Sequence, residues 1–462
     1  MSSSIAISKI PPEDGGYRHV LRLVLPLVLS NAAYTLMQFT DRILVSRFSS
    51  DSIQAALPAS VVSFCLLGFF CSIAGYSSTF AAQYYGAKDI RGAIRSCATG
   101  IWLSIFFIPF FLALIPLCNG LISLTGHAPV IQELEKRYAL WMLLGGPLVG
   151  MQWTLSGFLS AKNRATANAL AIAAGCVLNV ILDVLFIFGH GRIPAGGLEG
   201  AAIATFVSSV FTTLLLLSLT LLDKDVRANK LADQIRPDWN LVRRVLHFGL
   251  PSGTQLLLDQ GAWAFFIVLT GRLDALSLSA SNIAISINNL VFAPMLGFSM
   301  AASIVAGQFQ GAGKPLQAKS SVFRCLKLGW CYTLTLGLIF ILFPATLLDL
   351  FRSPDAVYST GELFRIGRVL LAMMAGWGVF DAMNIVFLSA LKGVGDTRFV
   401  MIYLLLVEWL FWIPPEILCI CVYHGSIINA WTIQLVFIIV LSIGFLIRWQ
   451  RGKWMSIQMI QR

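Results

Sequence analysis

The sequence predicts an all-α integral membrane protein with twelve transmembrane helices in two six-helix lobes, related by a pseudo-two-fold axis along the membrane normal. Three observations predict this fold class: an apolar composition, apolar runs of membrane-spanning length along the whole chain, and an internal repeat. Of the 462 residues, 57% are hydrophobic and only 12% are charged, whereas soluble domains average about 25% charged residues. A water-soluble protein of this length would need a far more polar surface.

Apolar runs recur along the whole chain, and a helix needs about 20 apolar residues to cross a bilayer. The segment before Val20 is polar, and the apolar run that follows it is too long for the core of a signal peptide. We therefore expect twelve spans and no cleavable signal peptide. The expected spans are residues 20–45, 54–83, 96–124, 131–155, 166–190, 197–222, 242–272, 283–308, 320–350, 361–391, 398–421 and 427–450.

The net charge of +11 is distributed in a way that indicates membrane topology rather than nucleic-acid binding. With the N-terminus placed inside, 24 of the 33 Lys and Arg residues fall at the inner ends of the spans and 9 at the outer ends. Such an excess marks the cytoplasmic side of membrane proteins. We expect a multi-pass protein of the cytoplasmic (inner) membrane with both termini in the cytoplasm, and the lipid bilayer, with its anionic lipid, as a partner.

Short motifs recur in the same order in the two halves of the chain, and the offset between the two copies is nearly constant. They are QYYGA at 83–87 with QFQGA at 308–312, Pro26 with Pro251, and FLSA at 158–161 with FLSA at 387–390. Each half contains six spans, so both halves start on the same side and form parallel repeats. We predict an N-lobe at 1–222, a polar cytoplasmic linker at 223–241, and a C-lobe at 242–462.

Four aspartates lie inside the apolar spans, namely Asp41, Asp183, Asp259 and Asp381. A carboxylate is costly in hydrocarbon, so its default interpretation is a pathway or coupling site. Two six-helix lobes that contain such carboxylates describe a secondary transporter.

The residues around these aspartates resemble the multidrug and toxic compound extrusion (MATE) family, and the resemblance runs from about residue 20 to 450. It is carried by Asp41 near the end of the first span, Asn179-x-x-x-Asp183 in the fifth, the Gly-rich turn PAGGLEG at 194–200 before Ala204-Thr205, and KGVGDT at 392–397 after the tenth. It implies two lobes that form an open V and cation-coupled export of mostly cationic, amphipathic compounds.

The resemblance implies an N-lobe site for the exchanged cation, formed by Asp41, Asn179, Asp183 and Thr205. Both aspartates follow the last inner-face arginine of their span by the same number of positions, so they share one depth in the membrane. Asn179 and Asp183 are four residues apart and share a helix face. The alternative is that these residues are polar contacts between helices, a role that Asn and Thr often have.

A second coupling site is expected in the C-lobe, formed by Asp259, Asp381 and Glu408. Asp259 and Asp381 match the acidic pair of sodium-linked relatives. Glu408 lies in the eleventh span and maps onto Asn179 at the offset that relates the two FLSA motifs. Glu416 follows two prolines nearer the outer face, and we expect it to be a lining or interfacial residue.

The sequence leaves the coupling ion open between Na⁺ and H⁺, and we expect no cofactor and no metal other than Na⁺ at these sites. A proton requires only a buried carboxylate, whereas Na⁺ requires several oxygens, often including backbone carbonyls. Arg42 and Trp377 stand where relatives often carry a small hydroxyl residue and a tyrosine. The match of Asp259 and Asp381 to sodium-linked relatives favours Na⁺.

The alternative within transport is a lipid-linked oligosaccharide flippase of the same superfamily. Such proteins bind pyrophosphate and place arginines in the central cavity, whereas no Arg or Lys lies in the middle of an expected span here. An intramembrane enzyme would need a nucleophile, base or metal constellation, and the chain has no Walker A motif, no GxSxG and no metal-ligand histidine spacing. We expect a non-enzymatic monomer that binds small organic cations and no nucleic acid.

The topology can be tested with a cysteine introduced in the 223–241 linker. It should be shielded from impermeant thiol reagents applied outside intact cells, because six of the cytoplasmic basic residues lie in or next to this linker. Ready labelling from outside would overturn the orientation.

Overall fold

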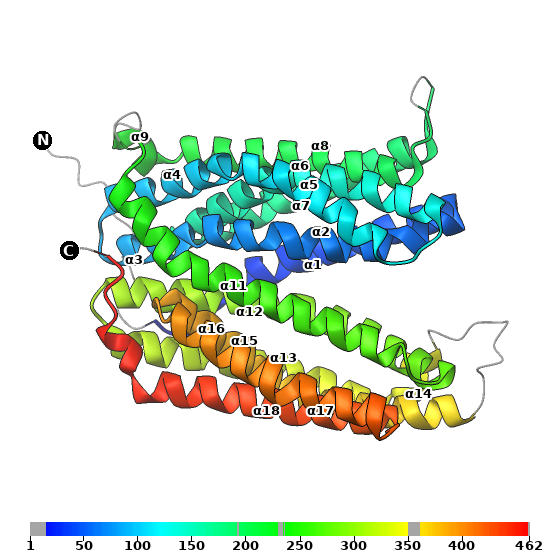
Figure 1. Ribbon diagram of the computed structural model, residues 1–462. Coiled ribbons are helices and arrows are strands. Elements are labelled where there is room, and N and C mark those ends of the chain that lie inside the picture. Colours follow the sequence, from blue (N-terminus) through cyan, green and yellow to red (C-terminus); the bar gives the residue numbers. More distant parts are fainter. Residues whose placement is uncertain (1–14, 192–193, 230–233, 235, 350–360, 461–462) are drawn as a thin grey trace, which may run out of the picture.

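The computed structural model describes residues 15–191, 194–229, 234, 236–349 and 361–460. In this part of the chain, nine helices are long and apolar enough to cross a membrane. A tenth span is the pair α4 (Ile90–Phe106) and α5 (Ile108–Ser123), which is bent by 42°. The helices run in one common direction, back and forth, which confirms the predicted all-α membrane class (Figure 1).

Each of the twelve expected spans coincides with one helix or one broken helix, so the predicted twelve-helix architecture is confirmed. In addition to α4 and α5 they are α1 (Tyr17–Phe48), α2 (Ser50–Gly75) with α3 (Ser77–Gly86), α6 (Pro129–Ala161), α7 (Ala165–Phe188), α8 (Gly197–Leu221), α11 (Trp239–Thr270), α12 (Ala275–Gly311), α13 (Pro315–Leu342), α15 (Gly361–Gly393), the run of α16 (Thr397–Leu405), η1 (Leu406–Trp412), α17 (Ile413–Ile417) and η2 (Leu418–Val422), and α18 (Ile427–Arg451). The remaining short elements among the described residues are α9 (Lys224–Ala228), η3 (Lys453–Ser456) and α14 (Pro344–Asp349), which follows α13 within the expected ninth span.

Two boundaries differ clearly from the expected ones: α12 begins at Ala275 rather than near residue 283, and the helix of the ninth span ends early. The sequence predicts that the ninth span reaches residue 350, but α13 ends at Leu342 and Pro344 opens the separate helix α14. Proline has no backbone N–H and clashes with the preceding turn, so it starts helices more readily than it continues them. Residue 350 itself, and residues 230–233 and 235 of the expected linker, lie outside the described residues.

Polar side chains define where many helices begin. The side chains of Ser49, Asp89, Asp238, Asp274 and Ser426 accept hydrogen bonds from backbone N–H groups at the starts of α2, α4, α11, α12 and α18. The first N–H groups of a helix have no partner within it, and such caps satisfy them.

The repeated QYYGA and QFQGA motifs end their helices in the same way. After α3, the backbone N–H of Asp89 donates to the carbonyl of Tyr84 at 2.9 Å, and the corresponding bond after α12 has the same length. Lys88 has φ 63° in the first turn, and its counterpart in the repeat, Gly313, has φ 72° in the second. Both turns are left-handed helix ends of the kind that usually carries glycine. The sequence repeat is therefore also a repeat of backbone structure.

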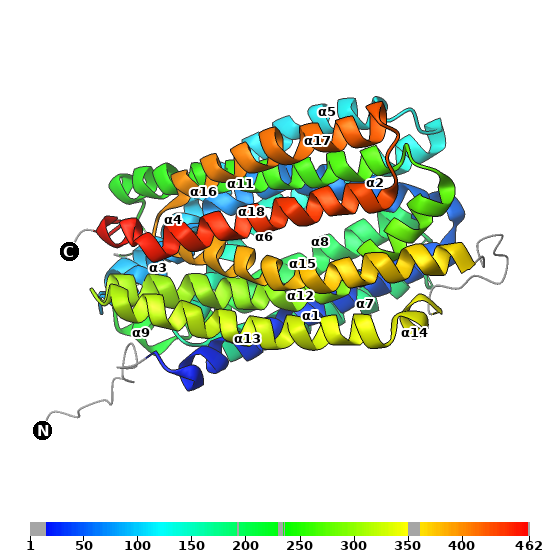
Figure 2. The ribbon, with the colours of Figure 1, turned by 90° about the horizontal axis from the view of Figure 1, so that it is seen from below.

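The helices form two groups, which we call the N-lobe (α1–α8) and the C-lobe (α11–α18) (Figure 1). Both views place the beginning of α1 and the end of α18 at the same end of the molecule, which we call the terminal end (Figures 1 and 2). Figure 2 shows α12, α13, α15 and α18 running side by side, and their inward faces form one large buried apolar cluster. A second such cluster lies among α2–α6.

The first helix of each lobe begins packed in the other lobe. Leu23 of α1 belongs to the C-lobe cluster, whereas Val45 near the end of the same helix packs with N-lobe residues. Conversely, Val245 of α11 belongs to the N-lobe cluster and Phe266 to the C-lobe cluster. Figure 1 shows α11 crossing obliquely from one group to the other. The two lobes are therefore joined at the terminal end by two crossing helices.

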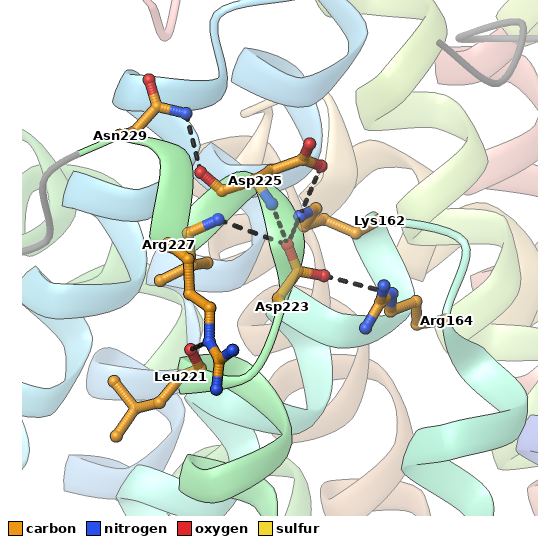
Figure 3. Close-up of polar contacts among 8 residues, drawn as sticks. Lys162, Arg164, Leu221, Asp223, Asp225, Arg227 and Asn229 are labelled. Atoms are coloured by element: carbon orange, nitrogen blue, oxygen red, sulfur yellow. Dashed lines mark hydrogen bonds and ion pairs between the residues drawn. The ribbon is translucent and has the colours of Figure 1, made fainter. Parts of the chain in front are cut away.

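An ion-pair cluster closes the N-lobe at the terminal end (Figure 3). The Lys162 ammonium pairs with Asp223 and lies 2.8 Å from an Asp225 oxygen, and Arg164 lies 3.1 Å from the second Asp223 oxygen. Burial opposes ionisation of Asp223, but the hydrogen bond and charge of Lys162 and the charge of Arg164 outweigh it and hold the pKa of Asp223 below its usual value. The cluster ties the turn between α6 and α7 to the end of α8.

The C-lobe carries the same connection with its charges reversed. Arg448 donates to Asp396 from Nε at 2.7 Å and from Nη2 at 3.1 Å. Arg448 is the counterpart of Asp223 in the repeat, and Asp396 occupies the turn between α15 and α16, the counterpart of the turn that holds Lys162. A bidentate arginine–carboxylate pair fixes geometry as well as charge. In each lobe, ion pairs therefore connect the turn between the fourth and fifth spans to the end of the sixth span.

We expect Asp223→Asn to lower the free energy of unfolding by about 3 kcal/mol at neutral pH, because it removes the buried partner of the Lys162 ammonium and leaves only the half-exposed Asp225. A lowered pKa contributes stability above the unfolded value of about 4 and loses it as the pH falls through the folded value. The difference between wild type and variant should therefore shrink on acidification. Thermal melting of the detergent-solubilised protein between pH 7 and pH 3 measures both effects.

The matched control is Glu133→Gln. Glu133 pairs with Arg137 at 2.9 Å, but both side chains are more than half exposed, and exposed pairs contribute about 0–1 kcal/mol. Equal losses in the two variants would contradict a structural role for the Asp223 cluster.

Candidate functional site

Three predicted residues of the N-lobe meet between α1 and α7, which pack side by side. Asn179 and Asp183, one turn apart on α7, are both fully buried, and Asp41 approaches them from α1. With its amide nitrogen turned toward the two acids, Asn179 donates to Asp41 Oδ1 at 3.1 Å and to Asp183 Oδ2 at 3.3 Å. The carboxyl groups of Asp41 and Asp183 are also in hydrogen-bonding contact with each other. Counting along the sequence predicts that Asp41 and Asp183 lie at one depth in the membrane, and in the structure the two side chains are in contact.

Two tyrosines that sequence reasoning did not single out complete this site. Tyr34 and Tyr138 both interact electrostatically with Asp41. Tyr34 lies seven residues before Asp41 on α1, and this spacing places both on one face of the helix. The sequence could therefore have indicated that Tyr34 lies on the same side of the helix as Asp41. Tyr138 comes from α6, where its hydroxyl accepts a hydrogen bond from Ser60 at 3.3 Å, and no sequence spacing could have placed it here.

Thr205, the fourth predicted N-lobe residue, uses its hydroxyl within its own helix. Its Oγ1 donates to the carbonyl of Ala201 at 3.0 Å. This back-bonding is common for threonine inside helices. The structure therefore supplies no direct contact between Thr205 and the two aspartates, and its membership of the site remains a prediction.

The C-lobe also contains a contact between two carboxyl groups, formed by Asp259 of α11 and Glu408. Glu408 is almost fully buried, and its Oε2 has no hydrogen-bond partner among the described residues. It lies in η1, a π-helical segment, and such segments often mark functional sites because they re-aim side chains. Gln260, next to Asp259, donates a further hydrogen bond to Asp259.

Asp381, the other acid of the expected C-lobe pair, lies near Asp259 on a different helix, and its membership of the site remains a prediction. Its carboxyl group accepts hydrogen bonds from Asn384, at 3.4 Å, and from the indole of Trp377 on the same helix. It interacts with Asp259 only electrostatically. The physical reason is helix placement: α11 packs against α16, η1 and α17, which carry Glu408, whereas Asp381 lies on α15.

A lysine reaches the C-lobe acids from the end of α15. Lys392 Nζ donates to Gln255 Oε1 at 3.0 Å, and its ammonium interacts electrostatically with Asp259, which lies one turn beyond Gln255 on α11. Counting along the sequence places Lys392 at the inner end of its span and finds no base deeper in the membrane. Its ammonium instead lies beside α11, the helix that carries Asp259.

Glu416 differs from its expected lining or interfacial position. Its side chain is fully enclosed, and one carboxyl oxygen accepts a hydrogen bond from the indole N–H of Trp412 at 3.2 Å. The second oxygen has no hydrogen-bond partner among the described residues. Trp412 is four residues earlier and also buried, so the pair lies on the inward face of the broken eleventh span.

The two acid pairs occupy equivalent helices but different turns. Each pair joins the first helix of its lobe to the fifth, which is α7 in the N-lobe and the α16–η2 run in the C-lobe. Glu408 corresponds to Asn179 at the offset of the FLSA motifs, and Asp259 corresponds to Tyr34 at the offset of the paired prolines. Both lobes therefore have a polar contact between their first and fifth helices, but different residues form it.

Comparison with known protein families identifies the chain. A family model described as MatE matches residues 26–185 and 251–418. The chain belongs to the MatE family. The two matched segments begin at Pro26 and Pro251, an equivalent pair of the repeat, so the family pattern occurs once in each half. The resemblance to the multidrug and toxic compound extrusion family is thereby confirmed.

Members of the MatE family with sequences similar to this chain include two proteins described as "Probable multidrug resistance protein NorM". The protein of Pseudomonas putida is 29% identical over 420 residues, covering 89% of each chain, and that of Bradyrhizobium diazoefficiens is 29% identical over 393 residues, covering 84% of this chain and 83% of its own. The matches cover nearly the whole length of both partners.

Solved structures share the fold of this MatE protein. One is described as the outward-facing conformation of a multidrug resistance MATE family transporter of the MOP superfamily, with a TM-score of 0.83, 22% identity, and coverage of 96% of this chain and 97% of that one. Another MOP superfamily transporter, from Pyrococcus furiosus, has a TM-score of 0.83 at 21% identity, covering 96% of this chain and 97% of its own. These structures support the twelve-helix, two-lobe fold.

Proposed function

We propose that this MatE protein is a secondary active exporter of the cytoplasmic membrane, with its terminal end in the cytoplasm, and that it exchanges cationic, amphipathic compounds for protons. Residues 1–222 and 242–462 act as its two lobes in this proposal, and 223–241 as the linker. Family membership and the relatives described as multidrug resistance proteins support the transport class. The acid pairs of the two lobes support the exchange.

The observation that carries the proposal is the contact of carboxyl with carboxyl in each lobe. Two ionised carboxylates repel each other at hydrogen-bonding distance in a buried site, so one exchangeable cation must accompany them. In the N-lobe this cation is shared by Asp41 and Asp183, and in the C-lobe by Asp259 and Glu408. Release of the cation and entry of a positively charged substrate leave the total charge of the interior unchanged.

The close approach of the two acids in each pair suits a shared proton, which binds between two oxygens, whereas a metal ion would hold the oxygens further apart. The Lys392 ammonium beside Asp259 also reduces the negative charge that would attract Na⁺. Na⁺ at the C-lobe acids, as the sequence match favoured, is the competing assignment.

The interior charge supports a cationic substrate. The acids of the two sites, with Asp381 and Glu416, outnumber their basic neighbours Lys392 and Arg42. A flippase for a pyrophosphate-linked lipid would instead require basic groups that face its substrate. The same arrangement, with no nucleophile–base pair identified at these acids, supports a transporter without enzymatic activity, acting as a monomer without cofactor.

Exchange at the N-lobe can be tested with Asp41→Asn and Asp183→Asn. Each variant removes one acid of the pair, so the shared proton has no site, and efflux of a fluorescent organic cation driven by an imposed gradient should be abolished. Uptake into everted membrane vesicles at matched expression measures this. Asp51→Asn is the matched control, because Asp51 is an exposed acid in the first turn of α2. Wild-type transport by both site variants would remove the N-lobe pair from the mechanism.

The coupling ion can be tested in everted vesicles prepared without Na⁺. An imposed pH gradient alone should drive transport by the wild type, and Glu408→Gln should reduce it about tenfold or more, since an amide cannot release a proton. Glu362→Gln, at an exposed acid on α15, is the control. Transport that requires Na⁺ and ignores the pH gradient would instead assign Na⁺ to Asp259 and Asp381.

A further inference from the structure

Two glutamines at equivalent positions of the repeat reach across the seam between the lobes at the terminal end. Gln83 of α3 donates from Nε2 to the carbonyl of Gly393 at 3.1 Å, and Gln308 of α12 donates from Nε2 to the carbonyl of Ala161 at 2.7 Å. Both glutamines are essentially inaccessible to solvent. The contacts are reciprocal, because each lobe supplies one donor and one acceptor.

The acceptors are the last residues of long helices. Ala161 ends α6 and Gly393 ends α15, and the last carbonyls of a helix have no partner within it. Each glutamine amide therefore satisfies a helix end of the opposite lobe. The phenol of Tyr76 adds a third contact of this kind, donating to the carbonyl of Lys392 at 2.6 Å.

The QYYGA and QFQGA motifs, which contain these glutamines, also bring the backbones of α3 and α12 into contact. A Cβ added to Gly86 would lie 1.9 Å from the carbonyl oxygen of Gln308, and a Cβ added to Gly311 would lie 1.9 Å from that of Gln83. No side chain fits in either space without separating the helices. The glycine of each motif thus permits the close approach that its glutamine then bridges.

The end of the chain covers this junction. Met459, which follows η3, is fully buried in the N-lobe cluster, and its sulfur accepts a hydrogen bond from Gln83 Nε2 at 3.0 Å. Gln310 holds the same segment on the C-lobe side by donating to the carbonyls of Met455 and Ile457. The segment therefore bridges both lobes over the seam.

We infer that Gln83 and Gln308 form a two-fold-related latch that holds the lobes together at the terminal end and opens once in each transport cycle. The inference rests on the proposed transport function, because an exporter must expose its interior to each side of the membrane in turn. Both glutamines are positioning residues: they set the equilibrium between closed and open seams and contact no substrate.

The chemistry of the latch suits reversible opening. Each bond joins a neutral amide to a backbone carbonyl, and such bonds contribute little net free energy because water replaces them when the partners separate. The latch lies at the ends of helices rather than in their middles, so water reaches the freed groups as soon as the seam opens. Gln83 and Gln308 lie at equivalent positions of the repeat, so we expect comparable effects from loss of either.

Labelling of a cysteine placed in the seam tests the latch. In the full-length protein, Ala82→Cys creates a thiol at a buried position facing Gly307, and mass spectrometry distinguishes it from the native cysteines. Adding Gln83→Leu or Gln308→Leu should raise its rate of reaction with a maleimide about fivefold, and combining both should raise it further. Gln152→Leu is the control, because Gln152 donates to Ser209 within the N-lobe.

The glycines provide a second, independent set of variants. Gly86→Ala and Gly311→Ala should raise the labelling rate more than the glutamine variants do, because each forces the two backbones apart. Gly120→Ala on α5 has open space around the added methyl group and should leave the rate unchanged. Unchanged labelling in both glutamine variants would overturn the latch, and raised labelling in the glycine variants would then assign the closed seam to backbone packing alone.

A reversible crosslink tests whether the seam must open. A Cβ on Gly307 would lie 3.3 Å from Ala82 Cβ, close to the separation of about 3.5–4.5 Å found in disulfides. Oxidation of the Ala82→Cys, Gly307→Cys protein in everted vesicles should stop transport, and reduction should restore it. Undiminished transport by the oxidised protein would refute opening. The labelling rates need neither substrate nor gradient, so they decide the latch even where wild-type vesicles export nothing and the proposed function fails.

Discussion

Each lobe buries a contact between two carboxyl groups inside a bundle whose outer surface is apolar, and the cost of that burial governs the rest of the structure. Charge in such surroundings must be paired or neutralised. Asn179 turns its amide toward the N-lobe acids, and the Lys392 ammonium lies near Asp259 in the C-lobe. In the proposed mechanism the acids stay in the interior only with a cation between them, and this requirement would link ion occupancy to helix packing.

The helices that carry the acids are also the helices that join the lobes. α1 holds Asp41 in its own lobe and begins in the C-lobe cluster, and α11 holds Asp259 and begins in the N-lobe cluster. A change in how either helix packs against its acid partner therefore acts on the seam at the terminal end. There the lobes meet through small residues and backbone carbonyls, which form discrete contacts that are either made or broken.

Much of the fold and half of the site could be predicted because they follow from local properties of the chain. The family resemblance pointed to Asp41, Asn179 and Asp183, and counting residues from the inner face placed the two aspartates at one depth, since rise per residue converts sequence position into depth. Asp381 shows where this method stops. The resemblance and the depth count both grouped it with Asp259, but its carboxyl group accepts hydrogen bonds from Asn384 and Trp377 of its own helix, and Asp259 is in contact with Glu408 instead. Tyr138 and the buried position of Glu416 were missed for the same reason.

The sequence by itself determined the membrane class, the twelve spans and the repeat, because apolar length, charge asymmetry and recurring motifs are all written along one dimension. Only the tertiary structure decided which polar groups meet. The pairing of Asp259 with Glu408, the reach of Lys392 and the reciprocal contacts of Gln83 and Gln308 depend on which helices are neighbours and how each is turned about its axis. Those two quantities arise from packing among many helices and belong to no single segment of the chain.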